Sequence, residues 1–126
     1  MNKLYPLKFT PIPKEKVWGG KYLRQEVFTD AEGELPIGES VDLCGLENES
    51  SMISNGFLAE NPIDDVIETY LGDILGDENY QEFGNLLPII IKRLDIGDRL
   101  SVQIHPDDET AMNLYNSYGK IGRAHV

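Results

Sequence analysis

The sequence predicts a mainly β protein, an antiparallel sandwich or barrel with one inserted helix. Two observations lead to this fold class. Short apolar or alternating segments recur along the chain and are separated by Gly, Pro and Asn-Gly signals. Only residues 62–75 repeat apolar side chains at helical spacing over a long stretch. The chain has 126 residues, which is enough for one domain with a core of its own.

The N-terminal residues 1–29 are expected to be extended because three prolines exclude a helix. The apolar side chains between these prolines suit an edge strand. Paired glycines at positions 19 and 20 predict a sharp break in the chain. The prolines are Pro6, Pro11 and Pro13, and the apolar residues are Leu7, Phe9 and Ile12.

Two short strands are expected next, after a loop over residues 30–38. Residues 38–44 alternate apolar and polar side chains, which is typical of a strand. Residues 52–54 form a second apolar segment, and Asn55-Gly56 after it predicts a tight turn.

Residues 62–75 form the clearest predicted helix. Asn61 suits the N-cap and Pro62 the first helical position. Acidic residues follow in the first turn, where the helix dipole favours negative charge. Gly76 is expected to end the helix.

The C-terminal third predicts a buried strand over residues 86–94, a turn at Gly97-Asp98 and a strand over residues 99–105. In the last strand, apolar and polar side chains alternate between the two faces. A short helix is expected to begin at Asp107, after Pro106 stops the strand.

The charge distribution excludes several classes of function. The net charge is -11, and residues 30–90 carry fifteen Asp and Glu with no Lys or Arg. Such a balance argues against binding nucleic acid or an anionic membrane surface. The acidic block is expected to be a solvated face, or else to meet a basic partner or the basic first segment. Because residues 1–6 lack the apolar core of a signal peptide and Cys44 is the single cysteine, a cytoplasmic setting is expected.

Gln103 and His105 are the candidate metal ligands. On a strand their side chains would leave the same face, roughly 7 Å apart. An imidazole is a good zinc ligand, but a zinc site normally needs three or four protein ligands, so spacing alone offers half a site. A satisfied polar pair explains the same pattern.

Other candidate residues have simpler structural explanations. The acidic residues 107–109 suit a helix start better than a metal site. Cys44 is expected to be a small buried apolar residue. Trp18 is expected to pack in a core rather than to stack on a sugar.

The ordered motifs of the chain closely resemble type I mannose-6-phosphate isomerases. The motifs include a strand followed by Leu-Ser-Val-Gln-Ile-His-Pro-Asp, and the resemblance extends to Lys120. The segments that carry it are residues 86–95, residues 98–108, Pro11 with residues 17–20, residues 38–40, Asn55-Gly56 and residues 118–120.

The resemblance implies a cupin-type antiparallel jelly roll that holds one zinc ion, of which this chain is the N-terminal part. It implies that mannose 6-phosphate and fructose 6-phosphate are interconverted, with Gln103 and His105 as metal ligands. Ser101 and Lys120 would line the substrate site. The family's next ligand is a Glu just after the Gly-Lys pair, and its last is a His much further along.

Two departures from the family pattern are present. Val41 stands where the family usually has Trp. After Lys120 the pattern is lost, and residues 121–126 contain no acidic ligand. Residues 120–126 can be back-translated as AAG ATC GGA AGA GCA CAC GTC, which matches a widely used sequencing adapter, so residues 121–126 are expected not to be native.

Three interpretations follow for the chain. It is expected to be part of an isomerase and inactive alone, because two family ligands are absent from its residues. A non-catalytic, cupin-like sugar-binding module is the alternative in a different functional class. In a third interpretation the chain does not fold stably, because strands that would pair its sheet edges are missing. The oligomeric state and the proton-transfer base are not indicated.

Overall fold

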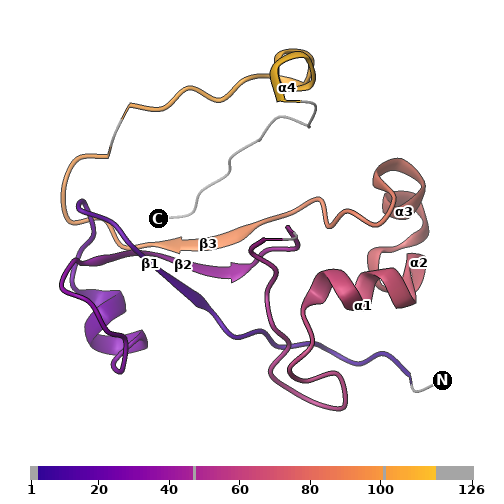
Figure 1. Ribbon diagram of the computed structural model, residues 1–126, viewed down its shortest axis with the longest axis horizontal. Helices are drawn as coiled ribbons and strands as arrows, with labels where there is room; N and C mark the ends of the chain where they lie inside the picture. The colour runs from indigo at the N-terminus through magenta and orange to yellow at the C-terminus, as the bar shows by residue number, and fades with distance from the viewer. Residues whose placement is uncertain (1–2, 47, 101, 116–126) are drawn as a thin grey trace.

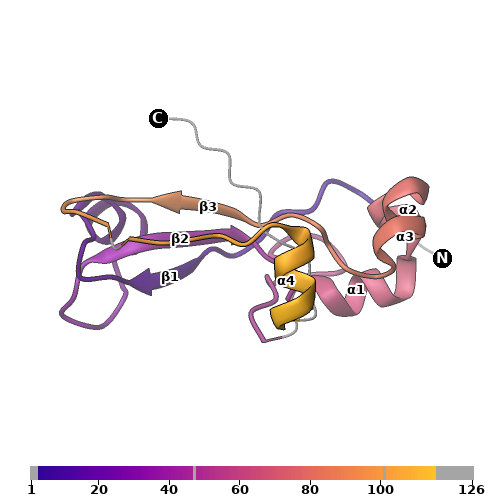
Figure 2. The same cartoon turned by 90° about the horizontal axis from the view of Figure 1, so that it is seen from above.

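A computed structural model describes residues 3–46, 48–100 and 102–115 of the protein. A three-stranded antiparallel sheet in the order β1-β2-β3 occupies its centre (Figure 1). A π-helical segment, η1, lies at one end of the sheet and α1 to α3 lie at the other, as both views show (Figure 2). The elements are β1 (Ile12–Glu15), η1 (Leu23–Val27), β2 (Ile37–Leu43), α1 (Ile63–Tyr70), α2 (Gly72–Leu75), α3 (Asp77–Phe83), β3 (Ile91–Leu94) and α4 (Asp108–Tyr115).

The predicted strand over residues 38–44 is confirmed as the central strand β2. Val41 pairs with Ile12 of β1 on one side and with Lys92 of β3 on the other. Val41 is only 1% exposed, so a branched aliphatic side chain fills this position. The predicted edge strand is confirmed in its last part as β1.

The apolar core lies between α1 and the N-terminal segment. The helical stripe expected over residues 62–75 supplies most of it, and Ile53 lies beside the stripe. Phe9 forms an antiparallel bridge with Ile53, which brings the N-terminal segment onto this core. The buried core residues of this cluster are Ile53, Ile63, Val66, Ile67 and Leu75.

The single helix expected over residues 62–75 is divided in the structure. Leu71 has φ 48° and ψ -121°, which ends α1, and the chain then forms the separate turn of α2. Gly76 ends α2 as expected, with φ 86°, but α3 follows directly. The periodicity did not reveal the break because Leu71 continues the apolar pattern.

The expected N-cap at Asn61 is wrong. The helix begins at Ile63, and the side chain of Asn61 donates to the carbonyls of Leu58 and Ala59 instead. Ser50 from a separate loop accepts the backbone N–H of Asp64 at 3.1 Å. A tertiary contact therefore satisfies one of the free N–H groups at the start of α1.

The expectation that residues 1–29 are extended throughout is also wrong, because η1 forms within them. None of the three prolines lies in η1, so their effect does not reach it.

The two strands expected in the C-terminal third are largely absent from the described residues. Of residues 86–94 only Ile91–Leu94 form a strand, and all four are exposed. Of residues 99–105, the described ones form no strand, and Val102 and Ile104 are 98% and 91% exposed. A strand requires a hydrogen-bonded neighbour, and in the described part of the chain only β2 pairs with β3. The alternating pattern by itself therefore does not make a strand of the described residues in this stretch.

The mainly β prediction is therefore only partly met. The described chain contains three strands, but four α-helices and η1 accompany them. The turn predicted at Gly97-Asp98 is present as a bend, and α4 begins at Asp108, one residue after the expected start.

Candidate functional site

The candidate metal ligands lie on an exposed segment that links the bend at Gly97-Asp98 to α4. Gln103 and His105 are both exposed, and neither belongs to a strand. The candidate substrate residues Ser101 and Lys120 lie outside the described residues. The described structure therefore places two of the four predicted site residues, and it places them on the same short segment.

The donor chemistry of these two residues suits zinc. An imidazole nitrogen is a common zinc ligand, and an amide oxygen can complete a mixed ligand set. Over residues 3–46, 48–100 and 102–115, no group of three His, Cys, Asp or Glu side chains is arranged to hold a metal ion. The described residues thus supply a partial ligand set rather than a complete metal centre.

The acidic residues after Pro106 act as a helix start, as expected. Asp107 Oδ1 accepts the backbone N–H of Thr110 at 2.8 Å. This hydrogen bond, which favours the charged form, lowers the pKa of Asp107 below its ordinary value. Its carboxylate is therefore engaged as a helix cap.

The N-terminal end of the candidate segment is anchored to the Trp18-Gly19-Gly20 motif. The backbone N–H groups of Gly97 and Asp98 both donate to the carbonyl of Trp18, at 2.8 and 3.1 Å. Gly19 forms an antiparallel bridge with Ile96. Two motifs that are far apart in the sequence therefore meet at the bend from which the segment carrying Gln103 and His105 begins.

We call the contact region between residues 18–20, Gly38 and residues 95–98 the glycine junction. Asp95 takes part in it through its backbone and its side chain. Its carbonyl accepts from Gly20 at 2.8 Å, and its N–H donates to the carbonyl of Gly38 at 2.9 Å. Asp95 Oδ2 accepts the backbone N–H of Leu23 at 2.9 Å. The carboxylate thus caps the start of η1 from the end of β3. The sequence placed Asp95 within a motif but gave no sign of its partner.

The glycines of this junction are required by close packing. A Cβ at Gly20 would lie 2.2 Å from Asp95 Oδ1, and one at Gly19 would lie 2.9 Å from the backbone nitrogen of Gly38. A Cβ at Gly97 would lie 2.8 Å from the carbonyl oxygen of Gly19. Only residues without a side chain allow the three motifs to approach so closely.

The core packing expected for Trp18 is not observed: the side chain is only partly buried and is not part of the apolar core around α1. A Cβ at Gly38 would lie 2.9 Å from Cζ3 of the indole, so the ring lies against this glycine. On β2, Glu39 forms an ion pair with Lys92 at 3.5 Å.

A polar network also links β2 to β3. Arg93 donates to both carboxylate oxygens of Asp42, and Ser40 donates to Asp42 at 2.7 Å. Ser40 is fully buried, so this network satisfies a polar group that would otherwise be costly.

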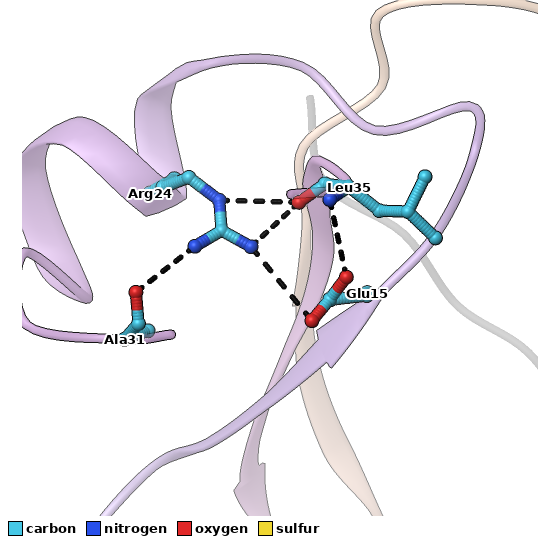
Figure 3. Close-up of polar contacts among 4 residues, drawn as sticks. All are labelled: Glu15, Arg24, Ala31 and Leu35. Carbon is cyan, nitrogen blue, oxygen red and sulfur yellow. Dashed lines mark hydrogen bonds and ion pairs between the residues drawn. The ribbon is translucent and has the colours of Figure 1, made fainter. Parts of the chain in front are cut away.

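Arg24 of η1 holds the loop that precedes β2. Its guanidinium donates to the carbonyls of Ala31 and Leu35 and forms an ion pair with Glu15, as the close-up shows (Figure 3). Glu15 in turn accepts the backbone N–H of Leu35. The planar guanidinium thereby fixes the loop between η1 and β2 against the end of β1.

An open groove of about 990 Å³ lies away from the candidate metal ligands, between β1, residues 45–50 and α1. Asp64 Oδ1, within this groove, is buried and has no hydrogen-bond partner. Lys14 and Glu49 form an ion pair at the groove. The Lys14 ammonium donates a hydrogen bond to the Glu49 carboxylate, and this contact lowers the pKa of Glu49 below its ordinary value. The hollow contains none of the predicted site residues.

Cys44 is buried and unpaired, as expected for a small apolar residue. Among the described residues, no helix is long and apolar enough to cross a membrane.

Comparison with known proteins identifies the family. The family model for the catalytic domain of type I phosphomannose isomerase matches residues 7–121, which is most of the chain. The chain belongs to the type I phosphomannose isomerase family. The glycine junction and the Gln103–His105 segment thus lie within the matched catalytic domain.

Three relatives match this chain over only part of their own length. A probable mannose-6-phosphate isomerase of Bacillus subtilis is 36% identical over 107 residues, which cover 85% of this chain and 32% of the relative. A mannose-6-phosphate isomerase of Streptococcus mutans is 33% identical, over 91% of this chain and 34% of the relative. A second enzyme of B. subtilis is 31% identical, over 94% and 35%. The chain spans about a third of the length of these relatives.

Solved phosphomannose isomerase structures share the fold. The mannose 6-phosphate isomerase of B. subtilis aligns with a TM-score of 0.71 and 27% identity, over 90% of this chain and 35% of that chain. A variant of phosphomannose isomerase from Salmonella typhimurium aligns with a TM-score of 0.68 and 26% identity, over 85% and 27%. The fold described above is therefore similar to that of the corresponding part of these isomerases.

Proposed function

We propose that the chain is the N-terminal part of a zinc-dependent isomerase that interconverts mannose 6-phosphate and fructose 6-phosphate. The observation that carries this proposal is the match of residues 7–121 to the catalytic domain of type I phosphomannose isomerase. The names of the relatives supply the substrate. The proposal includes a cupin-type jelly roll for the longer protein. The three-stranded sheet of the described residues does not close into a barrel by itself. A buried free thiol at Cys44 suits a cytoplasmic setting.

Gln103 and His105 are the residues of this chain proposed to hold the zinc ion. An ion bound there would stabilise the negative charge that develops on the substrate oxygens as the proton moves between neighbouring carbons. The hydroxyl of Ser101 and the ammonium of Lys120 would bind the sugar phosphate, since charge-assisted hydrogen bonds suit such a group. The backbone contacts of Trp18 with Gly97 and Asp98 support this assignment because they fix where the ligand-bearing segment begins.

The 126-residue chain by itself is expected to show negligible isomerisation. Two proposed ligands are too few for a catalytic zinc site, which normally has three protein ligands. Purified chain with added zinc should convert no mannose 6-phosphate above the rate without protein in an assay coupled to glucose-6-phosphate formation. Zinc-dependent turnover by this chain would refute the partial-site proposal.

The decisive experiment is performed on the longer gene, after the DNA beyond the codon for Lys120 has been sequenced. A Glu codon within the next few codons would supply the third ligand, and a genomic match to residues 121–126 would refute the adapter origin of that segment. In the extended protein, His105→Ala and Gln103→Ala should each weaken zinc binding by roughly tenfold or more. Asn113→Ala, on exposed α4, is the matched control and should retain its zinc.

Chelation of that extended protein separates an enzyme from a sugar-binding module. Removal of zinc should abolish isomerisation, and added zinc should restore it. A protein that binds mannose 6-phosphate equally well with and without zinc, and never isomerises it, would be the module instead.

A further inference from the structure

The Asn55-Gly56 turn has no part in the proposed function. It is hydrogen-bonded to the N-terminal segment, residues 5–8. Asn55 Oδ1 accepts the backbone N–H of Lys8 at 2.8 Å, and Asn55 Nδ2 donates to the carbonyl of Pro6 at 3.0 Å. The side-chain amide therefore makes a pair of hydrogen bonds resembling those between two β-strands. Ser54 N–H donates to the carbonyl of Lys8 at 2.8 Å directly beside this pair.

Tyr5 covers the turn from the same segment. Its hydroxyl donates to the carbonyl of Asn55 at 2.7 Å and accepts the N–H of Leu58 at 3.0 Å. A Cβ at Gly56 would lie 2.4 Å from Cζ of the tyrosine, so the ring lies directly on the glycine. Gly56 has φ 71°, and the turn depends on this left-handed conformation. Tyr5 also packs on Phe57, with ring centroids 5.2 Å apart.

An Asn-Gly pair is chemically reactive because glycine has no side chain to hinder ring closure. The backbone nitrogen of Gly56 loses its proton to water or hydroxide and attacks Cγ of Asn55. Nδ2 takes up a proton from water as the bond between Cγ and Nδ2 breaks, so that ammonia leaves and a succinimide remains. Water then opens the ring at either carbonyl, giving aspartate or isoaspartate.

We propose that Asn55 is a deamidation site and that its contacts with the N-terminal segment slow the reaction. Loss of the side-chain amide would then weaken the attachment of that segment. Ring closure requires Cγ to approach the Gly56 nitrogen, so the side-chain amide must leave Pro6 and Lys8. The tyrosine ring must move off Gly56 as well. The reaction therefore proceeds from the locally opened turn. Afterwards, a carboxylate oxygen faces the carbonyl of Pro6, where an N–H was donated before.

The rate of deamidation tests whether these contacts protect Asn55. Native chain in neutral buffer and chain unfolded in guanidinium chloride are compared by peptide mass spectrometry. We expect deamidation of Asn55 to be at least about tenfold slower in the native chain, because at least two hydrogen bonds must open first. Tyr5→Phe, which keeps the ring but removes the hydroxyl, should accelerate the reaction a few-fold. The matched control Tyr22→Phe should not. Equal rates in buffer and in denaturant would overturn the proposal.

Hydrogen exchange tests the consequence. In Asn55→Asp, the amides of Ser54 and Leu58 should exchange roughly fivefold or more faster than in the parent chain, as loss of one hydrogen bond predicts. The amide of Leu71, which donates to the Ile67 carbonyl at the end of α1, should be unchanged. Unchanged exchange at Ser54 and Leu58 would refute the weakened attachment. Equal acceleration at all three amides would show global unfolding and would refute the local effect.

Discussion

Asp95 shows how one side chain can hold two distant parts of the chain together. Its carboxylate caps Leu23, and its backbone contacts Gly20 and Gly38. Because it lies two residues before the bend at Gly97, it also helps to set the start of the segment that carries the proposed metal ligands. Its importance for stability can therefore be measured independently of catalysis.

Asp95→Ala should lower the free energy of unfolding by about 1–2 kcal/mol, the usual cost of losing a helix cap. Asp95→Asn should cost less, because an amide oxygen still accepts the N–H of Leu23. Denaturant unfolding followed by circular dichroism measures both variants. The control Asp98→Ala should stay within about 0.5 kcal/mol, since among the described residues Asp98 Oδ1 accepts the N–H of its sequence neighbour Arg99 and no long-range donor.

Leu71 carries backbone strain. With φ 48° and ψ -121° it occupies a region that side chains disfavour, at a typical cost of about 1–3 kcal/mol. Leu71→Gly should therefore stabilise the chain by about 1 kcal/mol, because glycine adopts this conformation freely. Leu71→Ala removes the same side chain without relieving the strain, so it should not stabilise. If both substitutions lower the melting temperature equally, strain at this position is not the dominant effect.

At the scale of elements, α4 depends on a titratable cap. The hydrogen bond to Thr110 lowers the pKa of Asp107, so the cap stabilises the helix above the ordinary value of about 3.8. This stabilisation is lost as the pH falls through the lowered pKa.

The N–H resonance of Thr110 should therefore shift with a midpoint below pH 3.8. Asp107→Asn keeps a capping oxygen but does not titrate, so the shift should disappear in that variant. A midpoint at or above the ordinary value of a free aspartate would contradict the cap. NMR spectra recorded across the acidic range provide the measurement.

The whole molecule presents an unusual amount of exposed apolar surface around β3 and the segment after it. Ile91 and Leu94 are about half exposed, and Val102 and Ile104 are almost fully exposed. β3 is also an edge of the sheet, with backbone groups available for pairing. Lys92 and Arg93 interrupt this surface, but both are engaged with acidic residues of β2.

The isolated chain is accordingly expected to self-associate as its concentration rises. Ile104→Glu should reduce association, measured by sedimentation, without changing the free energy of unfolding by more than about 0.5 kcal/mol. Ile53→Glu, at a core position that is 1% exposed, should instead abolish cooperative unfolding. If Ile104→Glu leaves the association unchanged, the exposed segment is not its cause.

The structure also shows what the acidic residues 30–90 contact. In the part of the chain that the structure describes, the acidic residues 30–90 meet the basic first segment at the Lys14–Glu49 ion pair, as one of the sequence interpretations allowed. Arg93 and Lys92 of β3 neutralise two more of these acids on β2. The acidic residues of α1 to α3 remain mostly exposed to solvent, which agrees with the simpler interpretation.

The amino-acid sequence was enough to predict the family, the central strand, the apolar helical stripe and, to within one residue, the start of α4. Each of these depends on a local sequence motif or on the regular spacing of apolar side chains, and both can be recognised without knowing which distant residues are in contact. It did not determine the break at Leu71, η1, the capping by Ser50 and Asp95, or the state of residues 99–105. Those features depend on which distant groups are near, because a hydrogen-bond donor, a cap or a strand edge is satisfied only by a partner in space. The Gln103–His105 segment has the alternation of a strand, yet its residues form none in the structure, because alternation does not say which segment will lie alongside.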